Sequence, residues 1–203
     1  MIETQLSNVE RQRRTLVTQY PFNAPAPMIG IAGWKNSGKT TLAVRLVEEF
    51  TRRGLRVATI KHAHHNLRLD DDDTDSARHR RAGAGQVAVV SSKRWAIMTE
   101  NGDAPEIDFE DVVARLDPCD VIIVEGYKSQ PIPKIEARRS EAVPGLQLAE
   151  KDAYVIAIAA DHSIGNADVP VFDLDNTSAI ADFVSEQLSI GTSGSSATHG
   201  ENA

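Results

Sequence analysis

A glycine-rich turn joins a short apolar run to an amphipathic segment near the start of the chain. The apolar run is Met28 to Ala32, and apolar residues recur at helical spacing over residues 42–50. Between them stands Gly33-x-x-x-x-Gly38-Lys39-Thr40, in the stretch GWKNSGKTT. A strand, a tight turn and a helix in this order restrict the chain to folds in which the turn lies at the end of a buried strand.

The residue types of this turn suit the binding of a polyphosphate. Gly33 and Gly38 allow backbone N–H groups to point inward at phosphate oxygens, and the following helix offers the positive end of its dipole. Lys39 adds a positive charge toward the β- and γ-phosphates, and the Thr40 hydroxyl is placed to bind Mg²⁺. The flanking strand and helix distinguish the pattern from an ordinary glycine-rich turn.

Two further residues of the turn are less informative. Lys35 either adds positive charge to the turn or is an exposed lysine without a role. Trp34 stands five places before Lys39, where some turns of this kind carry a second lysine.

The segment DVIIVEGY, residues 120–127, is the most strand-like part of the chain. Its continuous apolar character predicts a buried parallel strand. Residues that close such strands face a ligand across the carboxyl edge of the sheet. We therefore predict that Glu125 lies on the Mg²⁺ side of the site and that the Gly126 N–H lies near the γ-phosphate. Asp120, at the opposite end, is expected to cap the strand.

The remaining chain alternates between strand-like and helical patterns. Strands are predicted at 28–32, 55–63, 86–92, 94–100, 120–127 and 153–161, with 131–139 as a candidate edge strand; helices are predicted after the turn up to Gly54 and at 73–82, 107–116 and 180–188. This alternation predicts an α/β fold with a mostly parallel sheet and helices on both faces. We expect one domain, residues 28–190, between a flexible extension, 1–27, and a disordered tail, 191–203.

Composition narrows the possible partners. The chain has 203 residues and a net charge of -7, with an isoelectric point near 5.4, which argues against a protein that coats nucleic acid or an anionic membrane. A phosphate site must then be a local positive patch. The single cysteine permits no internal disulfide framework, and no apolar run approaches the roughly 18 residues of a membrane span. We expect a cytoplasmic location.

Three histidines follow the second predicted strand, in the sequence KHAHH. His62, His64 and His65 could bind a transition metal, contact a polar substrate or nucleotide, or belong to a solvated loop. The acidic residues 70–73 favour harder ions than those that histidine prefers. The three interpretations remain open at this point.

The acidic run continues into a predicted helix. It lacks the glycine and glutamate positions of a calcium-binding loop, so we expect Asp73 or Thr74 to cap the helix. Arg78, Arg80 and Arg81 on this helix either meet an anion or form a solvated face.

Several segments together resemble one known family. The segments are GWKNSGKTTL, VATIKHAHH, DSARHRRAGA, DVIIVEGYK, PKIEARR and AIAAD, spread from residue 28 to about 188. In this ordered set the chain is similar to the molybdopterin-guanine dinucleotide biosynthesis adapter family, MobB. The resemblance implies a GTP-binding P-loop NTPase fold, a homodimer, and slow GTPase activity at most. It also implies a partner, a guanylyltransferase that joins GMP to molybdopterin.

The resemblance also implies roles for individual positions. The phosphates would be held by Gly33, Lys35, Asn36, Ser37, Gly38, Lys39, Thr40 and Thr41, with Lys39 and Glu125 as the groups that act on them. Mg²⁺ would lie beside Thr40 and Glu125. Lys61, His62, Asp75, Arg78 and Lys128 would surround the nucleotide or a bound molybdopterin.

Guanine selectivity rests on this resemblance. The chain lacks the Asn-Lys-x-Asp signature with which many GTPases read guanine. Asp161, which ends a late buried strand, is the candidate reader of the base.

Two other functions would use the same turn. A small-molecule kinase would pass the γ-phosphate to a bound acceptor, with Arg78 and Arg80 as lid cations. A metal-insertion GTPase would carry its ion on the three histidines of KHAHH.

Overall fold

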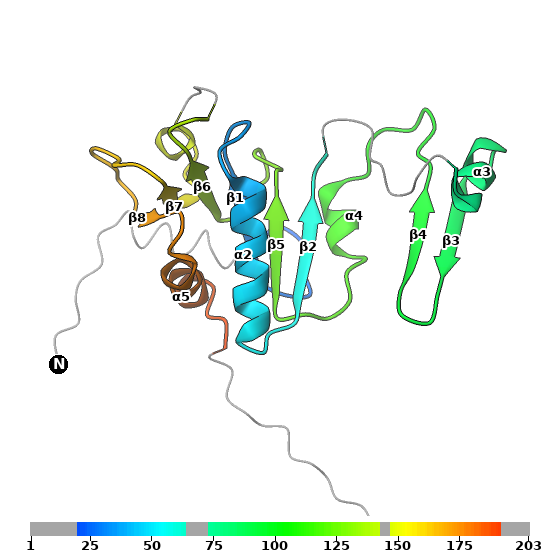
Figure 1. Cartoon of the computed structure of the whole chain (residues 1–203), viewed down its shortest axis with the longest axis horizontal. Helices are drawn as coiled ribbons and strands as arrows, with labels where there is room; N and C mark the ends of the chain where they lie inside the picture. Colours follow the sequence, from blue (N-terminus) through cyan, green and yellow to red (C-terminus); the bar gives the residue numbers. More distant parts are fainter. Residues whose placement is uncertain (1–19, 64–72, 143–146, 192–203) are drawn as a thin grey trace, which may run out of the picture. The chain divides into compact units, whose positions relative to one another are not determined.

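The computed structural model describes residues 20–63, 73–142 and 147–191 (Figure 1). Contacts divide the chain into a main unit, Met1–His62 with Leu116–Ala203, and a smaller unit, Ala63–Arg115. The smaller unit is therefore inserted in the chain of the main unit. The expectation of a single domain did not anticipate this insertion, because both units show strand and helix patterns of the same kind.

The main unit is built on a parallel sheet. Its elements are β1 (Met28–Ala32), α2 (Lys39–Arg52), β2 (Val57–Lys61), β5 (Val121–Glu125), β6 (Lys134–Arg138), the short 3-10 helix η1 (Leu148–Glu150), β7 (Val155–Ala160), β8 (Val171–Asp173) and α5 (Thr177–Gln187). The strand order is β2-β5-β1-β6-β7-β8, and every neighbouring pair is parallel. The predicted α/β fold is confirmed, and the carboxyl ends of the strands meet at one edge.

One face of this sheet is covered by α2 and α5. Side chains alternate between the faces of a strand, so Ile29 and Ile31 of β1 point to the same side. There they join Leu42, Leu46 and Phe50 of α2 and the buried residues of α5 in one apolar cluster. Gly54, with φ +84°, ends α2 as the sequence predicts. The two α-helices of the main unit thus share one layer.

The opposite face carries buried charges from β6. Lys134 and Glu136 are each 1% exposed. Lys134 Nζ donates to Asp152 Oδ2 at 2.9 Å, and burial lowers the pKa of Lys134 while Asp152 partly opposes that effect. The Glu136 carboxylate accepts from the N–H groups of Leu148 and Ala149 at 3.1 and 2.9 Å, so it holds the start of η1.

The prediction of an edge strand at 131–139 is wrong. β6 pairs with β1 on one side and β7 on the other. Its charged residues are accommodated inside the sheet because Lys134 pairs with Asp152 and Glu136 pairs with Arg138. The short strand β8 was not predicted, because its three residues carry too little pattern.

The sequence also placed the start of the fold too late. Tyr20 Oη donates to the Met28 carbonyl at 3.2 Å and accepts from the Met28 N–H at 2.8 Å. Burial raises the pKa of the Tyr20 hydroxyl. Ala26 is buried as well. Residues 20–27 therefore belong to the described fold, whereas residues 1–19 lie outside the described part.

The smaller unit is a hairpin with a helix on one face. β3 (Gln86–Val90) and β4 (Trp95–Thr99) are antiparallel and form a sheet of their own. α3 (Asp75–Arg81) packs on β3, and α4 (Phe109–Val113) follows the hairpin. The Thr74 hydroxyl accepts from the Ala77 N–H, which confirms Thr74 as the predicted cap.

No helix in the described part of the chain has the length and apolar character needed to cross a membrane.

Replacing the buried carboxylate tests the polar layer. Arg138 Nη2 donates to Glu136 Oε2 at 2.7 Å, so Glu136→Gln leaves this arginine without its ionic partner. We expect the free energy of unfolding to fall by about 3 kcal/mol in urea denaturation. The control Glu186→Gln, on the exposed side of α5, should change it by less than about 0.5 kcal/mol. Equal effects in the two variants would contradict the assignment.

Candidate functional site

The turn between β1 and α2 has the backbone of a phosphate loop. Gly33 and Gly38 adopt φ +147° and +89°, and Asn36 adopts φ +64°. A Cβ on Gly33 would lie 2.4 Å from Ser37 Oγ and 2.6 Å from the Ala137 carbonyl oxygen, so only glycine fits there. Because α2 begins directly after Gly38, its first N–H groups point into the turn.

A cavity of about 500 Å³ lies over this turn. Its lining consists of residues 36–41 together with Arg139 and Glu141. The predicted phosphate-binding residues Asn36, Ser37, Gly38, Lys39, Thr40 and Thr41 are therefore brought to one cavity. Lys35 is exposed on the same turn, and its role stays a prediction.

Lys39 is the half-buried cation of the site. Its Nζ donates to the Trp34 carbonyl at 2.6 Å. Burial is the largest cause that lowers the pKa of Lys39; Lys128 and Lys61 lower it further, and Glu125 opposes them. Three lysines from β2, α2 and the segment after β5 thus form the local positive patch that a chain of net charge -7 requires.

Thr40, at the start of α2, meets Glu125, at the end of β5. Thr40 Oγ1 donates to Glu125 Oε1 at 2.6 Å, and Lys61 Nζ lies 3.3 Å from Glu125 Oε2. Strand register explains the meeting, because Glu125 lies opposite Ile31 of β1 and Lys61 of β2. A hydroxyl and a carboxylate are the oxygen ligands that Mg²⁺ takes together with phosphates and waters. The donor set therefore fits Mg²⁺.

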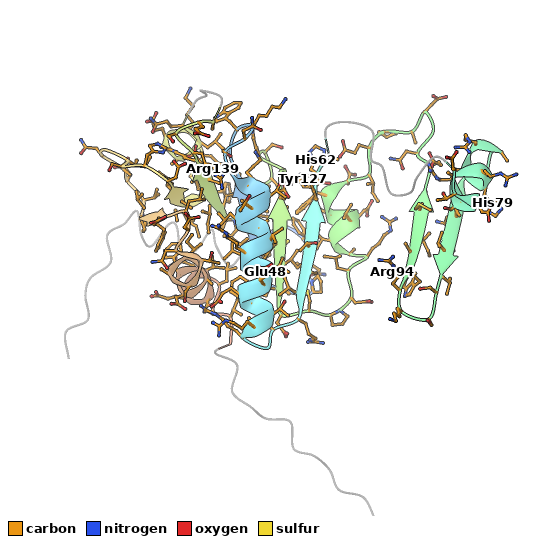
Figure 2. The ribbon with its side chains drawn as sticks, in the orientation of Figure 1. Glu48, His62, His79, Arg94, Tyr127 and Arg139 are labelled. Atoms are coloured by element: carbon orange, nitrogen blue, oxygen red, sulfur yellow. The ribbon has the colours of Figure 1, made fainter. Side chains whose placement is uncertain are left out.

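The segment after β5 borders the same edge. Gly126 adopts φ +92°, and Tyr127 adopts φ +44°. The His62 ring stacks on Tyr127 with 4.5 Å between ring centroids, and Figure 2 shows the two side chains together. Lys128 Nζ lies 4.0 Å from the centroid of the Trp34 ring. His62 thus contacts Tyr127 and Lys128 contacts Trp34 of the loop; their contact with a nucleotide or a pterin stays a prediction.

The predicted contact between the Gly126 N–H and the γ-phosphate does not fit this structure. The Gly126 N–H donates to the Ile31 carbonyl at 3.3 Å. The N–H that we expected near the γ-phosphate is therefore engaged in the sheet. Gly126 instead allows close approach of β2, because a Cβ there would lie 3.0 Å from His62 Cβ.

Asp161 has a local role that the sequence did not reveal. Its Oδ1 accepts from the Ser140 N–H and pairs with His162 Nδ1, both at 2.8 Å. Hydrogen bonding from His162 is the largest cause that lowers the pKa of Asp161, and the Ser140 N–H adds to it. Asp161 thereby connects the segments that follow β6 and β7, and its part in reading guanine stays a prediction.

The remaining candidates belong to the smaller unit or lie outside the described residues. Asp75 and Arg78 form an ion pair of 3.4 Å on α3 of the smaller unit, and both are exposed. His64 and His65 lie outside the described residues. Within the described ranges, no three His, Cys, Asp or Glu side chains gather as metal ligands.

Arg139 is the site residue that the sequence reasoning missed. Its Nε lies 2.8 Å from the point where a Cβ on Gly38 would be, and its side chain lines the phosphate-loop cavity. Arg139 directly follows β6, at the carboxyl edge next to β1 (Figure 2). The rule that identified Glu125 would have identified it too, had 131–139 not been interpreted as an edge strand.

Comparison with known proteins assigns the chain to a family. Residues 28–161 match the family described as "Molybdopterin guanine dinucleotide synthesis protein B", MobB. The chain belongs to the MobB family. That match spans β1 to the end of β7 and includes the phosphate loop, Glu125 and Arg139.

Curated relatives and solved structures agree with this assignment. Proteins named molybdopterin-guanine dinucleotide biosynthesis adapter protein are 39% identical over 82% of this chain and 92% of the protein in Haemophilus influenzae, and 40% identical over 80% and 93% in Escherichia coli. The crystal structure of Bacillus subtilis MobB matches with a TM-score of 0.61 and 25% identity, covering 80% of this chain and 98% of that one. A MobB homolog from Bacillus stearothermophilus matches with a TM-score of 0.58 and 26% identity, over 80% and 97%. These names do not favour the small-molecule kinase or the metal-insertion GTPase.

A methyl group on Gly33 tests the loop geometry. Gly33→Ala would force a positive φ on alanine and a contact with the Ala137 carbonyl, so we expect a loss of stability of about 3 kcal/mol, within the range for strained backbone plus overpacking. Thermal unfolding followed by circular dichroism measures it. Gly165→Ala is the matched control, because a Cβ there meets nothing within 4 Å. A Gly33→Ala variant as stable as the control would refute the close approach.

Proposed function

We propose that this MobB-family chain is a GTP-binding adapter that assists a guanylyltransferase in attaching GMP to molybdopterin. The observation that carries the proposal is the meeting of Thr40 with Glu125 beside the half-buried Lys39 at a phosphate loop. Relatives named as adapters of molybdopterin-guanine dinucleotide biosynthesis supply the pathway. Residues 28–190 would form the GTP-binding part, in a cytoplasmic protein.

The geometry gives each group a separate task. Backbone N–H groups of the loop would bind phosphate oxygens, and Lys39 would neutralise the β- and γ-phosphates. Thr40 and Glu125 would hold Mg²⁺, which when bound neutralises charge on the phosphates. Lys61 already pairs with Glu125 and would keep this carboxylate oriented. Hydrolysis, if it occurs, would be slow and accessory to the adapter role.

The other predicted contacts extend this proposal. His62 and Lys128 would border the nucleotide or a bound molybdopterin, since both lie beside the loop. Asp75 and Arg78 would contribute from the smaller unit.

Removing the loop lysine tests the proposed function. Lys39→Ala should weaken GTP binding by about 100-fold in the presence of Mg²⁺, because a charge-assisted contact to phosphate is lost in a partly buried site. Isothermal titration calorimetry gives the affinity, and a coupled assay gives stimulation of the guanylyltransferase. The control Lys93→Ala, at an exposed lysine between β3 and β4, should change the affinity by less than about threefold.

Two results would contradict the proposal. Undiminished GTP affinity in Lys39→Ala would show that the loop is not the nucleotide site. Full stimulation of the guanylyltransferase by a variant that no longer binds GTP would show that the nucleotide site is not the functional centre.

We also propose that the chain forms a homodimer through the hairpin of the smaller unit. On one face of that hairpin Val90 lies opposite Trp95, and Ala88 lies opposite Ile97. Val90, Trp95 and Ile97 are 76%, 68% and 52% exposed. A two-stranded sheet is only marginally stable, and its edges can pair with another chain. A second copy is the partner that the family resemblance implies.

Replacing the exposed aromatic residue tests the dimer. Trp95→Ser should raise the dissociation constant of the dimer by about 30-fold or more, because large aromatic side chains dominate interface energies. Size-exclusion chromatography with light scattering across a dilution series measures the mass. Val44→Ser, at an exposed apolar position on α2, is the control and should leave the mass unchanged. A monomeric parent chain, or a dimer unaffected by Trp95→Ser, would contradict this interface.

A further inference from the structure

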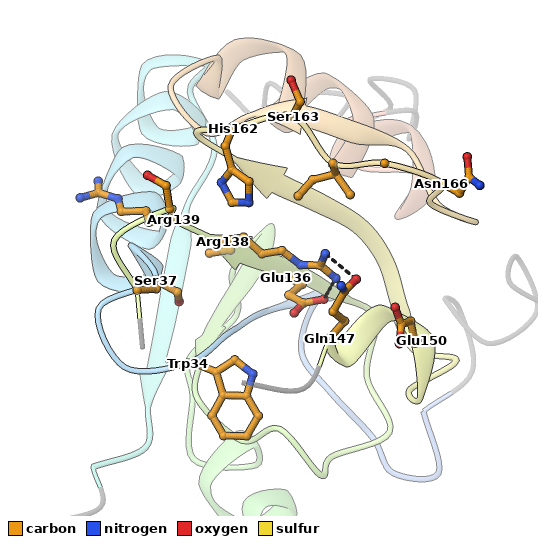
Figure 3. A pocket seen from close by; sticks show the side chains of 15 residues that line it. Trp34, Ser37, Glu136, Arg138, Arg139, Gln147, Glu150, His162, Ser163 and Asn166 are labelled. Atoms are coloured by element: carbon orange, nitrogen blue, oxygen red, sulfur yellow. Dashed lines mark hydrogen bonds and ion pairs between the residues drawn. The ribbon is translucent and has the colours of Figure 1, made fainter. Parts of the chain in front are cut away.

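A second cavity, of about 550 Å³, adjoins the phosphate-loop cavity within the main unit (Figure 3). The two cavities share Ser37 and Arg139 in their walls. Glu136 and Arg138 of β6 line the second cavity, whereas Ala137 between them also belongs to the apolar cluster under α2. The second cavity therefore extends over the face of the sheet that carries the buried charges. Its volume is in the range of pockets that hold small ligands.

The floor of this cavity is fixed by internal pairing. Arg138 Nη2 donates to Glu136 Oε2 at 2.7 Å, and Arg138 Nη1 donates to Gln147 Oε1 at 3.0 Å (Figure 3). Only 12% of the Arg138 side chain and 2% of the Glu136 side chain are exposed. Because these charges compensate each other, the floor needs no ionic ligand to neutralise it, and Arg138 Nε remains a buried donor without a hydrogen-bond partner among the described residues.

Polar groups without partners remain in the walls. Ser37 is 2% exposed, and its hydroxyl has no hydrogen-bond partner among the described residues. Figure 3 shows this hydroxyl directed from the phosphate loop toward the cavity. Glu150, at the end of η1, lines the cavity on the other side, and within the described ranges no hydrogen bond or ion pair engages its carboxylate. A buried hydroxyl and an exposed carboxylate on the walls of one cavity favour a ligand that carries hydrogen-bonding groups of its own.

Two ring side chains stand on opposite sides of the opening. Trp34 comes from the phosphate loop and His162 from the segment after β7 (Figure 3). The contact from His162 Nδ1 to Asp161 Oδ1, at 2.8 Å, orients the histidine ring. Indole and imidazole faces across a cavity suit a flat ring system between or beside them. Asn166 lines the same cavity and adds an amide side chain to its wall (Figure 3).

We infer that this second cavity binds the 2-amino-4-oxopyrimidine ring that guanine and pterins share. Such a ring presents a ring N–H and an exocyclic amino group side by side, and the Glu150 carboxylate can accept from both. The Asn166 amide can donate to the ring carbonyl, and Trp34 offers a stacking surface. Phosphate attached to the ligand would reach Arg139, which lines both cavities. This inference rests on the proposed function, in which GTP and a pterin are both handled.

Neutralising Glu150 tests the recognition of the ring. Calorimetry would compare GTP with ITP, which lacks the 2-amino group, and would then titrate neopterin monophosphate into protein saturated with GTP. If guanine occupies the cavity, a preference for GTP over ITP of about tenfold should fall nearly to unity in Glu150→Gln. If a pterin occupies it, neopterin monophosphate should bind beside GTP, and Glu150→Gln should weaken that binding about tenfold. Glu186→Gln is the matched control and should change neither result.

A cavity-filling variant gives an independent readout. Gly165 lines the cavity, and a Cβ there would meet nothing within 4 Å, so Gly165→Trp should fold while it fills the space. We expect it to reduce binding of the ring ligand about tenfold or more and to leave binding of inorganic tripolyphosphate unchanged, because tripolyphosphate needs only the phosphate loop.

The outcomes separate the inference from the function on which it rests. Unchanged affinities for GTP, ITP and neopterin monophosphate in both Glu150→Gln and Gly165→Trp would overturn the inference. Failure of the parent chain to bind tripolyphosphate would instead count against the phosphate loop as the nucleotide site, and the neopterin titration would still judge the ring site.

Discussion

β1 pairs with β5 on one side and with β6 on the other, and the site depends on this pairing. The register sets Ile31 opposite Glu125 and Ala32 opposite Glu136. Side chains alternate between the two faces of a strand, so a slip by one residue would move Glu125 to the wrong face of the sheet. The same pairing brings the turn after β1 next to Arg139. β1 and its two neighbours thus position the three parts of the site: the phosphate loop, the Glu125 carboxylate and Arg139.

The charged residues are concentrated at two places in the main unit, around the phosphate loop and on one face of the sheet. The chain is acidic overall, yet lysines from three elements gather around the phosphate loop. On the other face of the sheet, Lys134 and Glu136 are buried with partners that satisfy them. Buried ion pairs contribute little net stability, but each fixes a specific segment in place. Here they hold η1 and the following residues against β6, and so they shape the second cavity.

Local patterns made much of the fold predictable. The strand-turn-helix from β1 to α2, the cap at Thr74 and the buried strand ending at Glu125 all follow from residue types within a few positions. The errors came from features that depend on distant partners. β6 resembled an edge strand because its charged residues find their partners elsewhere in the chain, and the hairpin of the smaller unit gave no sign that it forms a separate sheet.

The sequence by itself determined the phosphate loop and the α/β class, because glycine spacing, helix periodicity and apolar runs act over short distances. It also placed Lys39 and Thr40 correctly, since both belong to the loop itself. Only the tertiary structure decided that Thr40 meets a carboxylate 85 residues away and that Arg139 stands against Gly38. Those contacts depend on strand order, which is set by how whole faces of the sheet are buried and not by any local pattern.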